Sequence, residues 1–317
     1  MKKYTAVSHD IIPNSRPVWN SVFTAIGEMD ERVTALVADL SRPTFTDQFK
    51  NTFPDRFHNV GIAEQNMLGI AAGLALKGKI PYCVTYAPFG SMRASEQFRT
   101  DACYMNLPVR LISVGSGLSP AGATHSGMED AGIMRTMANA VVVAPGDPWA
   151  FGQLLADSVR REGPVYFRLG FGMGERHIYG DDADLKIGEA VELKEGKDIT
   201  VIAFGVTVPD ALAAAEELEA EGIGVQVIDM HTIKPLDKEA VLSAMEATGK
   251  IITVEDHNVI GGLGSAVAEV IAESGKGCAF RRLGIPDTYA HFGSLPYLHR
   301  TYGYDKQAVI EAVREML

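Results

Sequence analysis

The chain has 317 residues, 46% of them hydrophobic, which is long enough for two domains of ordinary size. With 40 acidic and 29 basic residues its net charge is −11, which disfavours nucleic acid or an anionic membrane as a partner, because both require a basic surface. The three cysteines are far apart and form neither a metal-ligand spacing nor a disulfide framework. The N-terminus lacks an apolar signal core and no stretch reaches the length of a membrane span. A cytoplasmic protein is predicted.

Short β-branched runs alternate with helical patterns in the first half of the chain. Buried strands are predicted at 33–39, 80–87, 109–114, 140–144 and 165–168, and helices at 64–77, 91–105, 128–138 and 148–161. Alternation of this kind predicts a largely parallel sheet with helices on both faces.

A second series of the same kind follows a polar stretch at 170–185, which lacks periodicity and is interpreted as a linker. Strands are predicted at 199–203, 225–228, 251–254 and 280–283, and helices at 208–220, 238–247, 264–273 and 306–316. The predicted fold class is therefore α/β, with two domains at 1–180 and 187–317 joined near residue 180.

Glu64 is the first candidate for chemistry, because it stands just before the apolar helical run at 68–75. A carboxylate beside so apolar a stretch loses hydration, which favours its holding or sharing a proton. An acidic residue that is simply stabilised by the start of a helix explains the same position equally well. The residue alone does not decide between these two explanations.

Three further segments have a functional and an ordinary explanation. Phe89 follows the strand at 80–87, and ligands of parallel sheets bind beyond the carboxyl ends of strands, although an ordinary core residue is equally consistent. A glycine-rich loop begins at Gly115 and ends at His125; histidine is the residue type best suited to proton transfer near neutral pH, although most loop histidines are not catalytic. Arg168 ends a predicted strand, where its charge needs a partner.

Together these segments resemble the transketolase-type, thiamine-diphosphate-dependent enzymes, most closely the small C-terminal half of transketolases that are split into two polypeptides. The resemblance covers nearly the whole chain and rests on Gly-Ile-Ala-Glu-Gln-Asn-Met (61–67), Ala-Thr-His (123–125), Thr-Ile-Lys-Pro-Leu-Asp (232–237) and Val-Glu-Asp-His-Asn (254–258). It implies a pyrimidine-binding domain at 1–180, and at 187–317 a transketolase C-terminal domain that builds subunit interfaces.

The resemblance also implies a role for each candidate residue in cofactor binding. Glu64 would exchange a proton with N1′ of the cofactor's aminopyrimidine ring. Phe89 would stack on that ring, a contact worth about 0.5–1.5 kcal/mol beyond burial. Arg93 fits the family's pattern in the same segment. Ser95 stands where the family usually has an aromatic residue, so one wall of this pocket is expected to be smaller or more polar.

Substrate contacts are implied for His125, Arg168 and Arg16. His125 would donate a hydrogen bond or a proton to the substrate carbonyl, and the two arginines would bind a terminal phosphate. Ala121 and Ser113 are also expected to line the substrate site, and both depart from the sugar-phosphate enzymes: Ala121 stands where an aspartate reads a hydroxyl group, and Ser113 where a histidine contacts phosphate. Losing a hydroxyl reader removes discrimination on the order of 1–3 kcal/mol, so a non-standard substrate is expected.

The family's metal-binding sequence Gly-Asp-Gly is absent from this chain. The resemblance therefore implies that a larger subunit binds the diphosphate and Mg²⁺ and that this chain contributes no metal ligand. It also implies that the active enzyme is an α2β2 assembly, in which this chain associates with itself through its C-terminal domain.

The expected activity is transfer of a two-carbon ketol unit from a ketose or ketose phosphate to an aldehyde. Three alternatives stay open. The chain could be the β subunit of a 2-oxoacid dehydrogenase, which dependence on a lipoyl acyltransferase would favour. It could belong to a synthase that condenses pyruvate with an aldehyde. In another class, it could be a non-catalytic regulatory or interaction subunit, which failure to bind cofactor with any partner would establish.

Overall fold

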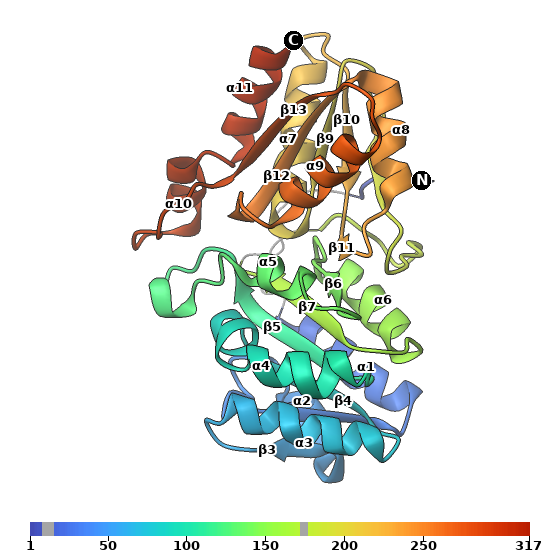
Figure 1. Cartoon of the computed structure of the whole chain (residues 1–317), viewed down its shortest axis with the longest axis vertical. Helices are drawn as coiled ribbons and strands as arrows, with labels where there is room; N and C mark the ends of the chain where they lie inside the picture. Colours follow the sequence, from blue (N-terminus) through green and yellow to red (C-terminus); the bar gives the residue numbers. More distant parts are fainter. Residues whose placement is uncertain (8–15, 172–176) are drawn as a thin grey trace.

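The computed structural model describes residues 1–7, 16–171 and 177–317, with side chains described from residue 20 onward after the first gap. The chain forms two α/β domains, one above the other (Figure 1). Each is built on its own sheet, and helices cover both sheets. Within the described residues, no helix is both long and apolar enough to cross a membrane.

The first domain contains a seven-stranded sheet in the order β11-β6-β7-β5-β4-β2-β3. Its strands are β2 (Val33–Val37), β3 (Phe57–Asn59), β4 (Ile80–Tyr86), β5 (Arg110–Ser116), β6 (Val141–Val143), β7 (Val165–Gly170) and β11 (Thr232–Lys234). Its α-helices are α1 (Arg16–Met29), α2 (Asp47–Thr52), α3 (Glu64–Leu76), α4 (Ser95–Gln97), α5 (Asp130–Arg135) and α6 (Pro148–Val159). All neighbours are parallel except β11 and β6. Because helices cover both faces, a strand such as β2 is buried throughout and is apolar along its length.

The second domain contains a six-stranded sheet in the order β1-β8-β10-β9-β12-β13. Its strands are β1 (Lys2–Lys3), β8 (Val191–Lys194), β9 (Ile199–Ala203), β10 (Val225–Asp229), β12 (Lys250–Asn258) and β13 (Ala279–Ile285). Its helices are α7 (Val208–Glu219), α8 (Lys238–Thr248), α9 (Leu263–Glu273), α10 (Leu295–Tyr302) and α11 (Lys306–Met316). Aspartates begin two of these helices, since Asp237 accepts from the Ala240 N–H and Asp305 from the Ala308 N–H. The predicted α/β class with two domains is confirmed.

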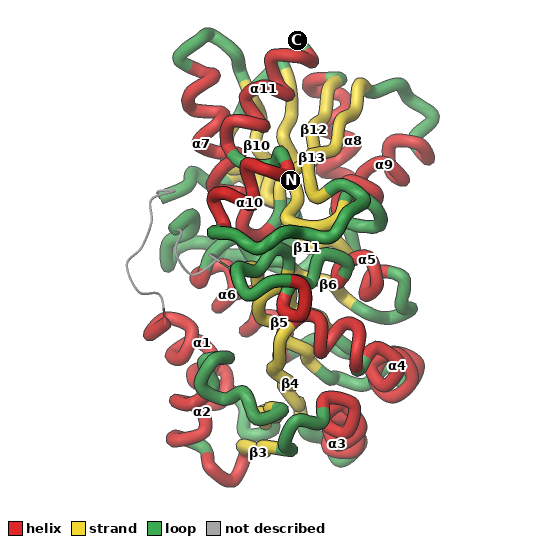
Figure 2. Tube along the Cα trace, turned by 90° about the vertical axis from the view of Figure 1, so that its left-hand side faces the viewer, coloured by secondary structure: helices red, strands yellow, loops and turns green. Residues whose placement is uncertain are grey.

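The two domains exchange edge strands, which the predicted boundary near residue 180 does not account for. β1, at the start of the chain, pairs with β8 of the second sheet, and the N-terminus accordingly lies beside the second domain (Figure 2). In the opposite direction β11 follows β10 of the second domain but pairs with β6 of the first. The backbone hydrogen bonds of both strands therefore tie the domains together.

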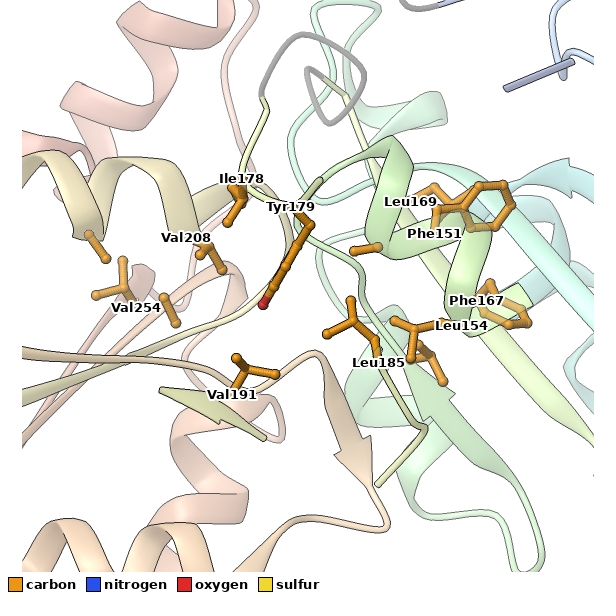
Figure 3. Packing of buried hydrophobic residues seen from close by; sticks show 14 of the residues in the cluster. Phe151, Leu154, Phe167, Leu169, Ile178, Tyr179, Leu185, Val191, Val208 and Val254 are labelled. Atoms are coloured by element: carbon orange, nitrogen blue, oxygen red, sulfur yellow. The ribbon is translucent and has the colours of Figure 1, made fainter. Parts of the chain in front are cut away.

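Of the segment predicted as a linker, residues 172–176 lie outside the described part of the structure, and residues 178–185 are packed between the domains. Ile178, Tyr179 and Leu185 are buried in a cluster that includes residues of both domains (Figure 3). Asp147, the N-cap of α6, accepts hydrogen bonds from the backbone N–H groups of Ile178 (2.6 Å) and Tyr179 (2.8 Å). The Tyr179 hydroxyl in turn donates to Asp229 over 2.7 Å. The polar composition of residues 170–185 suggested a free linker, but the buried residues Ile178, Tyr179 and Leu185 anchor the segment.

Asp229 makes stability depend on pH. Burial raises the pKa of Asp229 to about 7 from an ordinary value of 3.8. Between about pH 4 and 7 the folded protein holds a proton that the unfolded chain releases, so the free energy of unfolding falls as pH rises through this range. Asp229→Asn keeps an acceptor for Tyr179 and removes this dependence, which is on the order of 2–4 kcal/mol.

Reversible urea unfolding at pH 5 and pH 8 measures the difference. We expect the natural protein to lose more stability than Asp229→Asn between these two values. Burial also raises the pKa of Glu255 to about 7 and lowers the pKa of His231 to about 4, and these two groups contribute slopes of opposite sign, so the difference between the two proteins isolates Asp229. Equal slopes in the two proteins would show that Asp229 does not titrate as its burial requires.

Candidate active site

A π-helical turn at Phe89–Arg93 follows strand β4 and begins the site. The N–H of Ala94 donates to the carbonyl of Phe89, five residues earlier, over 3.1 Å. Such turns are frequent at functional sites. The turn brings the guanidinium of Arg93 over the ring of Phe89, with 4.2 Å from Cζ to the ring centroid, a favourable cation–π contact. A helix was predicted from residue 91; helical structure in fact begins at residue 87, four residues earlier, and includes this turn.

Glu64 is the first residue of α3 and is only 2% exposed. Both of its carboxylate oxygens lie 3.0 Å from Nη1 of Arg93. A buried carboxylate needs such a partner, and the positive end of the α3 dipole stabilises it further. Arg93, by contrast, is half-exposed. The arginine therefore joins the acidic residue and the aromatic ring that the sequence singled out into one continuous group.

His125 also lies beside Phe89. It ends the short 3-10 turn Ala123–His125, and its ring centroid is 5.7 Å from that of Phe89 and 5.1 Å from that of Tyr86. Its Nδ1 atom is 2.9 Å from the Thr124 hydroxyl. Sequence reasoning did not select Tyr86, although its place as the last residue of β4 satisfies the rule that ligands bind at strand ends.

A residue of the second domain binds the start of the glycine-rich loop, which belongs to the first domain. Asp256, on β12, accepts a hydrogen bond from the Leu118 N–H over 3.0 Å and another from the Tyr304 hydroxyl over 2.7 Å. A Cβ atom on Gly117 would lie 1.9 Å from Oδ2 of Asp256, and the φ of Gly117 is +75°, so only glycine fits there. This contact between domains was not predicted, because 138 residues separate the two partners.

The roles predicted for Arg168 and Ser113 need correction. The side chain of Arg168 is 1% exposed; its Nε is 2.9 Å from Asp130 Oδ1, and its Nη2 donates to the Asp256 carbonyl. It therefore lies inside the protein between the two domains and does not present its guanidinium to a substrate phosphate. Ser113 is fully buried within β5 and does not reach the site surface either.

The other two predicted substrate residues are Ala121, which the structure describes, and Arg16, whose side chain it does not describe. Ala121 is exposed on the glycine-rich loop, close in the chain to His125. Arg16 begins α1, but its side chain lies outside the described part of the structure. The structure therefore brings Glu64, Arg93, Phe89 and His125 together, with Ala121 on the loop that holds His125.

The two α/β domains place a buried acid, an aromatic face and a loop histidine close together near the ends of parallel strands, where ligands of such sheets bind. The family described as "Transketolase, pyrimidine binding domain" matches residues 13–171, and "Transketolase, C-terminal domain" matches residues 188–309. The chain belongs to the transketolase family.

Similar proteins of the same length agree. A putative transketolase C-terminal section of Methanocaldococcus jannaschii is 38% identical over 95% of each chain. A 6-deoxy-6-sulfo-D-fructose transketolase subunit of Clostridium sp. (strain MSTE9) is 38% identical over 95% of this chain and 94% of its own length. A solved split-gene transketolase, described as an inactive β4 tetramer, is 39% identical with a TM-score of 0.86, covering 95% of this chain and 97% of its own.

These findings confirm the identification of the chain as the C-terminal subunit of a split transketolase, and with it the class of enzyme, a transketolase-like transferase that works as one subunit of a heteromeric protein. Members of this family use thiamine diphosphate.

Proposed function

We propose that this chain binds the aminopyrimidine ring of thiamine diphosphate and, with a larger subunit, transfers a two-carbon ketol unit from a ketose to an aldehyde. The observation that carries the proposal is the continuous group of Glu64, Arg93, Phe89 and His125. A 2%-exposed carboxylate and an aromatic face, joined by one arginine, suit a flat heteroaromatic ring that carries a protonatable nitrogen.

Each residue has a defined task in this proposal. Glu64 holds a proton at N1′ of the bound ring, and Arg93 keeps the buried carboxylate paired. Phe89 orients the ring by stacking. His125 hydrogen-bonds the substrate carbonyl or moves a proton to it, with Thr124 fixing its ring through Nδ1. When bound, thiamine diphosphate supplies the carbon nucleophile and the electron sink that cleavage of the substrate's C–C bond requires.

The diphosphate and Mg²⁺ are assigned to the larger subunit in an α2β2 assembly, and self-association to the second domain. The absence of Gly-Asp-Gly from the sequence supports this division. A similar solved chain is described as inactive in its β4 form, and a similar relative is named as a subunit. Among the described residues there is no group of three or more His, Cys, Asp or Glu side chains that could hold a metal ion.

The substrate is proposed to differ from ordinary pentose phosphates. Ala121 is exposed where the family has a hydroxyl-reading aspartate, and neither Ser113 nor Arg168 is placed to bind a phosphate. A relative with a similar sequence is named for the sulfosugar 6-deoxy-6-sulfo-D-fructose, which supports a modified ketose as the donor. A ketose or 2-oxoacid donor with fewer hydroxyl contacts on this side is the class of substrate that suits these residues.

Affinity purification of the tagged chain from its source cells tests the proposal. Mass spectrometry identifies the retained protein, and a fluorescence assay after oxidation of the cofactor measures thiamine diphosphate. We expect a partner that carries Gly-Asp-Gly and retains cofactor. Recovery of the chain without cofactor, with every such partner supplied, would establish the non-catalytic subunit instead. Retention of a lipoyl acyltransferase would point to the dehydrogenase.

A further inference from the structure

A segment of the second domain reaches the loop that holds His125. The segment at 286–294 connects β13 to α10 and extends toward the first domain, where the glycine-rich loop precedes α5 (Figure 1). The ring of Phe292 lies directly on Gly122: a Cβ atom there would be 2.1 Å from Cε1 and 2.6 Å from Cζ of the ring. A larger residue at position 122 would therefore require this ring to shift.

Gly122 determines where His125 lies. Its φ is +83°, a conformation that favours glycine, and its N–H donates to the Ser119 carbonyl over 3.2 Å. Its carbonyl accepts hydrogen bonds from the His125 N–H (2.9 Å) and the Ser126 hydroxyl (3.1 Å). A ring that fixes Gly122 thus also fixes the start of the turn that carries the histidine.

The second domain therefore supports this loop at two points. Asp256 holds its start through the Leu118 N–H, as described above. Phe292 holds its middle through Gly122. The two contacts come from different elements, β12 and the segment before α10. The loop's position relative to Phe89 is consequently set by both domains, although the second domain was expected only to build interfaces.

The remainder of the Phe292 ring is available to a ligand. The residue is 75% exposed although it touches Gly122. The exposed residues Pro120, Ala121 and Ala123 on the loop beside it carry no polar side-chain atom, and the hydroxyl of the exposed Thr124 pairs with His125 Nδ1. Aromatic and aliphatic surfaces favour C–H-rich parts of a ligand. A hydroxyl group placed against them loses its bound water and gains no new hydrogen-bond partner. This side of the site therefore favours a substrate that is short of hydroxyl groups.

We propose that Phe292 is a specificity-determining residue of the second domain, which forms an apolar wall beside His125 and favours deoxygenated over fully hydroxylated substrates. The proposal rests on the proposed function and names the substrate class of the same site. It assigns a substrate-facing role to a domain that carries none of the cofactor-binding residues.

The first test concerns the contact itself and needs neither partner nor substrate. Hydrogen–deuterium exchange of the peptide covering 117–126 is compared in the natural chain, Phe292→Ala and Phe292→Leu. We expect about tenfold faster exchange in Phe292→Ala and a smaller increase in Phe292→Leu. Tyr289→Ala is the matched control, because Tyr289 is 76% exposed in the same segment. Unchanged exchange in Phe292→Ala would overturn the proposal.

The second test concerns specificity and uses the complex with the larger subunit. Hydroxypyruvate delivers the two-carbon unit with release of CO₂, and propanal or D-glyceraldehyde accepts it. The ratio of kcat/KM for propanal to kcat/KM for glyceraldehyde is expected to fall about tenfold in Phe292→Ala and little in Phe292→Leu or Tyr289→Ala.

The outcomes separate this proposal from the function on which it rests. An unchanged ratio in a fully active Phe292→Ala complex would overturn the role of Phe292 and leave the function standing. An equal loss with both aldehydes, or a loss of the larger subunit, would make Phe292 a structural or interface residue instead. A natural complex that retains no cofactor would overturn the function, and the proposal with it.

Discussion

Glu64→Gln is expected to slow C2–H exchange of bound thiamine diphosphate by about 10²–10⁴-fold in the assembled enzyme. Glutamine has the shape of glutamate, but its amide neither takes up nor releases a proton at N1′. Because the side chain of Glu64 is only 2% exposed, water is not expected to replace it. Quenched exchange in D₂O, read by NMR of the released cofactor, gives the rate directly.

Glu96→Gln is the matched control for this experiment, since Glu96 is an exposed carboxylate on the neighbouring helix α4. Thiamine diphosphate bound to the Glu96→Gln enzyme is expected to exchange its C2–H at the natural rate. The Glu64→Gln complex must retain cofactor for the comparison to hold, and the half-exposed Arg93 can turn to solvent when its partner is neutral. Fast exchange in a cofactor-loaded Glu64→Gln complex would show that another group manages the proton at N1′.

The strands and helices of the core could be predicted because they carry strong local patterns. The predicted ranges for β9 and α11 coincide with the structure, and α3 and β4 differ only at their ends. β1, β8 and β11 were not predicted. They have two, four and three residues, too few for a periodic signal, and their pairing depends on partners elsewhere in the chain. The exchange of edge strands between domains is therefore a property of tertiary structure.

Part of the candidate site could also be predicted from the sequence. Glu64, Phe89 and His125 follow or precede strands of one parallel sheet, so the rule for strand ends brings them together. The error at Arg168 has a physical cause: a charge at a strand end needs a partner, and the sequence does not say whether the partner is a ligand or another side chain. That partner is Asp130, on helix α5. Asp256 and Phe292 act from the other domain, which no local pattern reveals.

Asp130→Ala is expected to lower the free energy of unfolding by about 3–5 kcal/mol, because it leaves the charge of Arg168 buried without its acidic partner. Both side chains are almost fully buried, at 1% and 0% exposure. Asp130 also accepts a hydrogen bond from the Tyr166 hydroxyl over 2.8 Å, which the substitution removes as well. Urea unfolding, followed by circular dichroism, measures the loss.

The chain provides an internal comparison for this ion pair. Arg135 on α5 pairs with Glu269 on α9, so this pair joins the two domains, whereas Asp130 and Arg168 both belong to the first domain, and Glu269 is 58% exposed. Glu269→Ala is therefore expected to cost only about 0–1 kcal/mol. Replacing Arg168 and Asp130 together by Met and Leu removes both buried charges and should recover much of the loss of Asp130→Ala. If Asp130→Ala cost no more than Glu269→Ala, the buried pair would not stabilise the fold of the first domain, and the substrate role of Arg168 would have to be reconsidered.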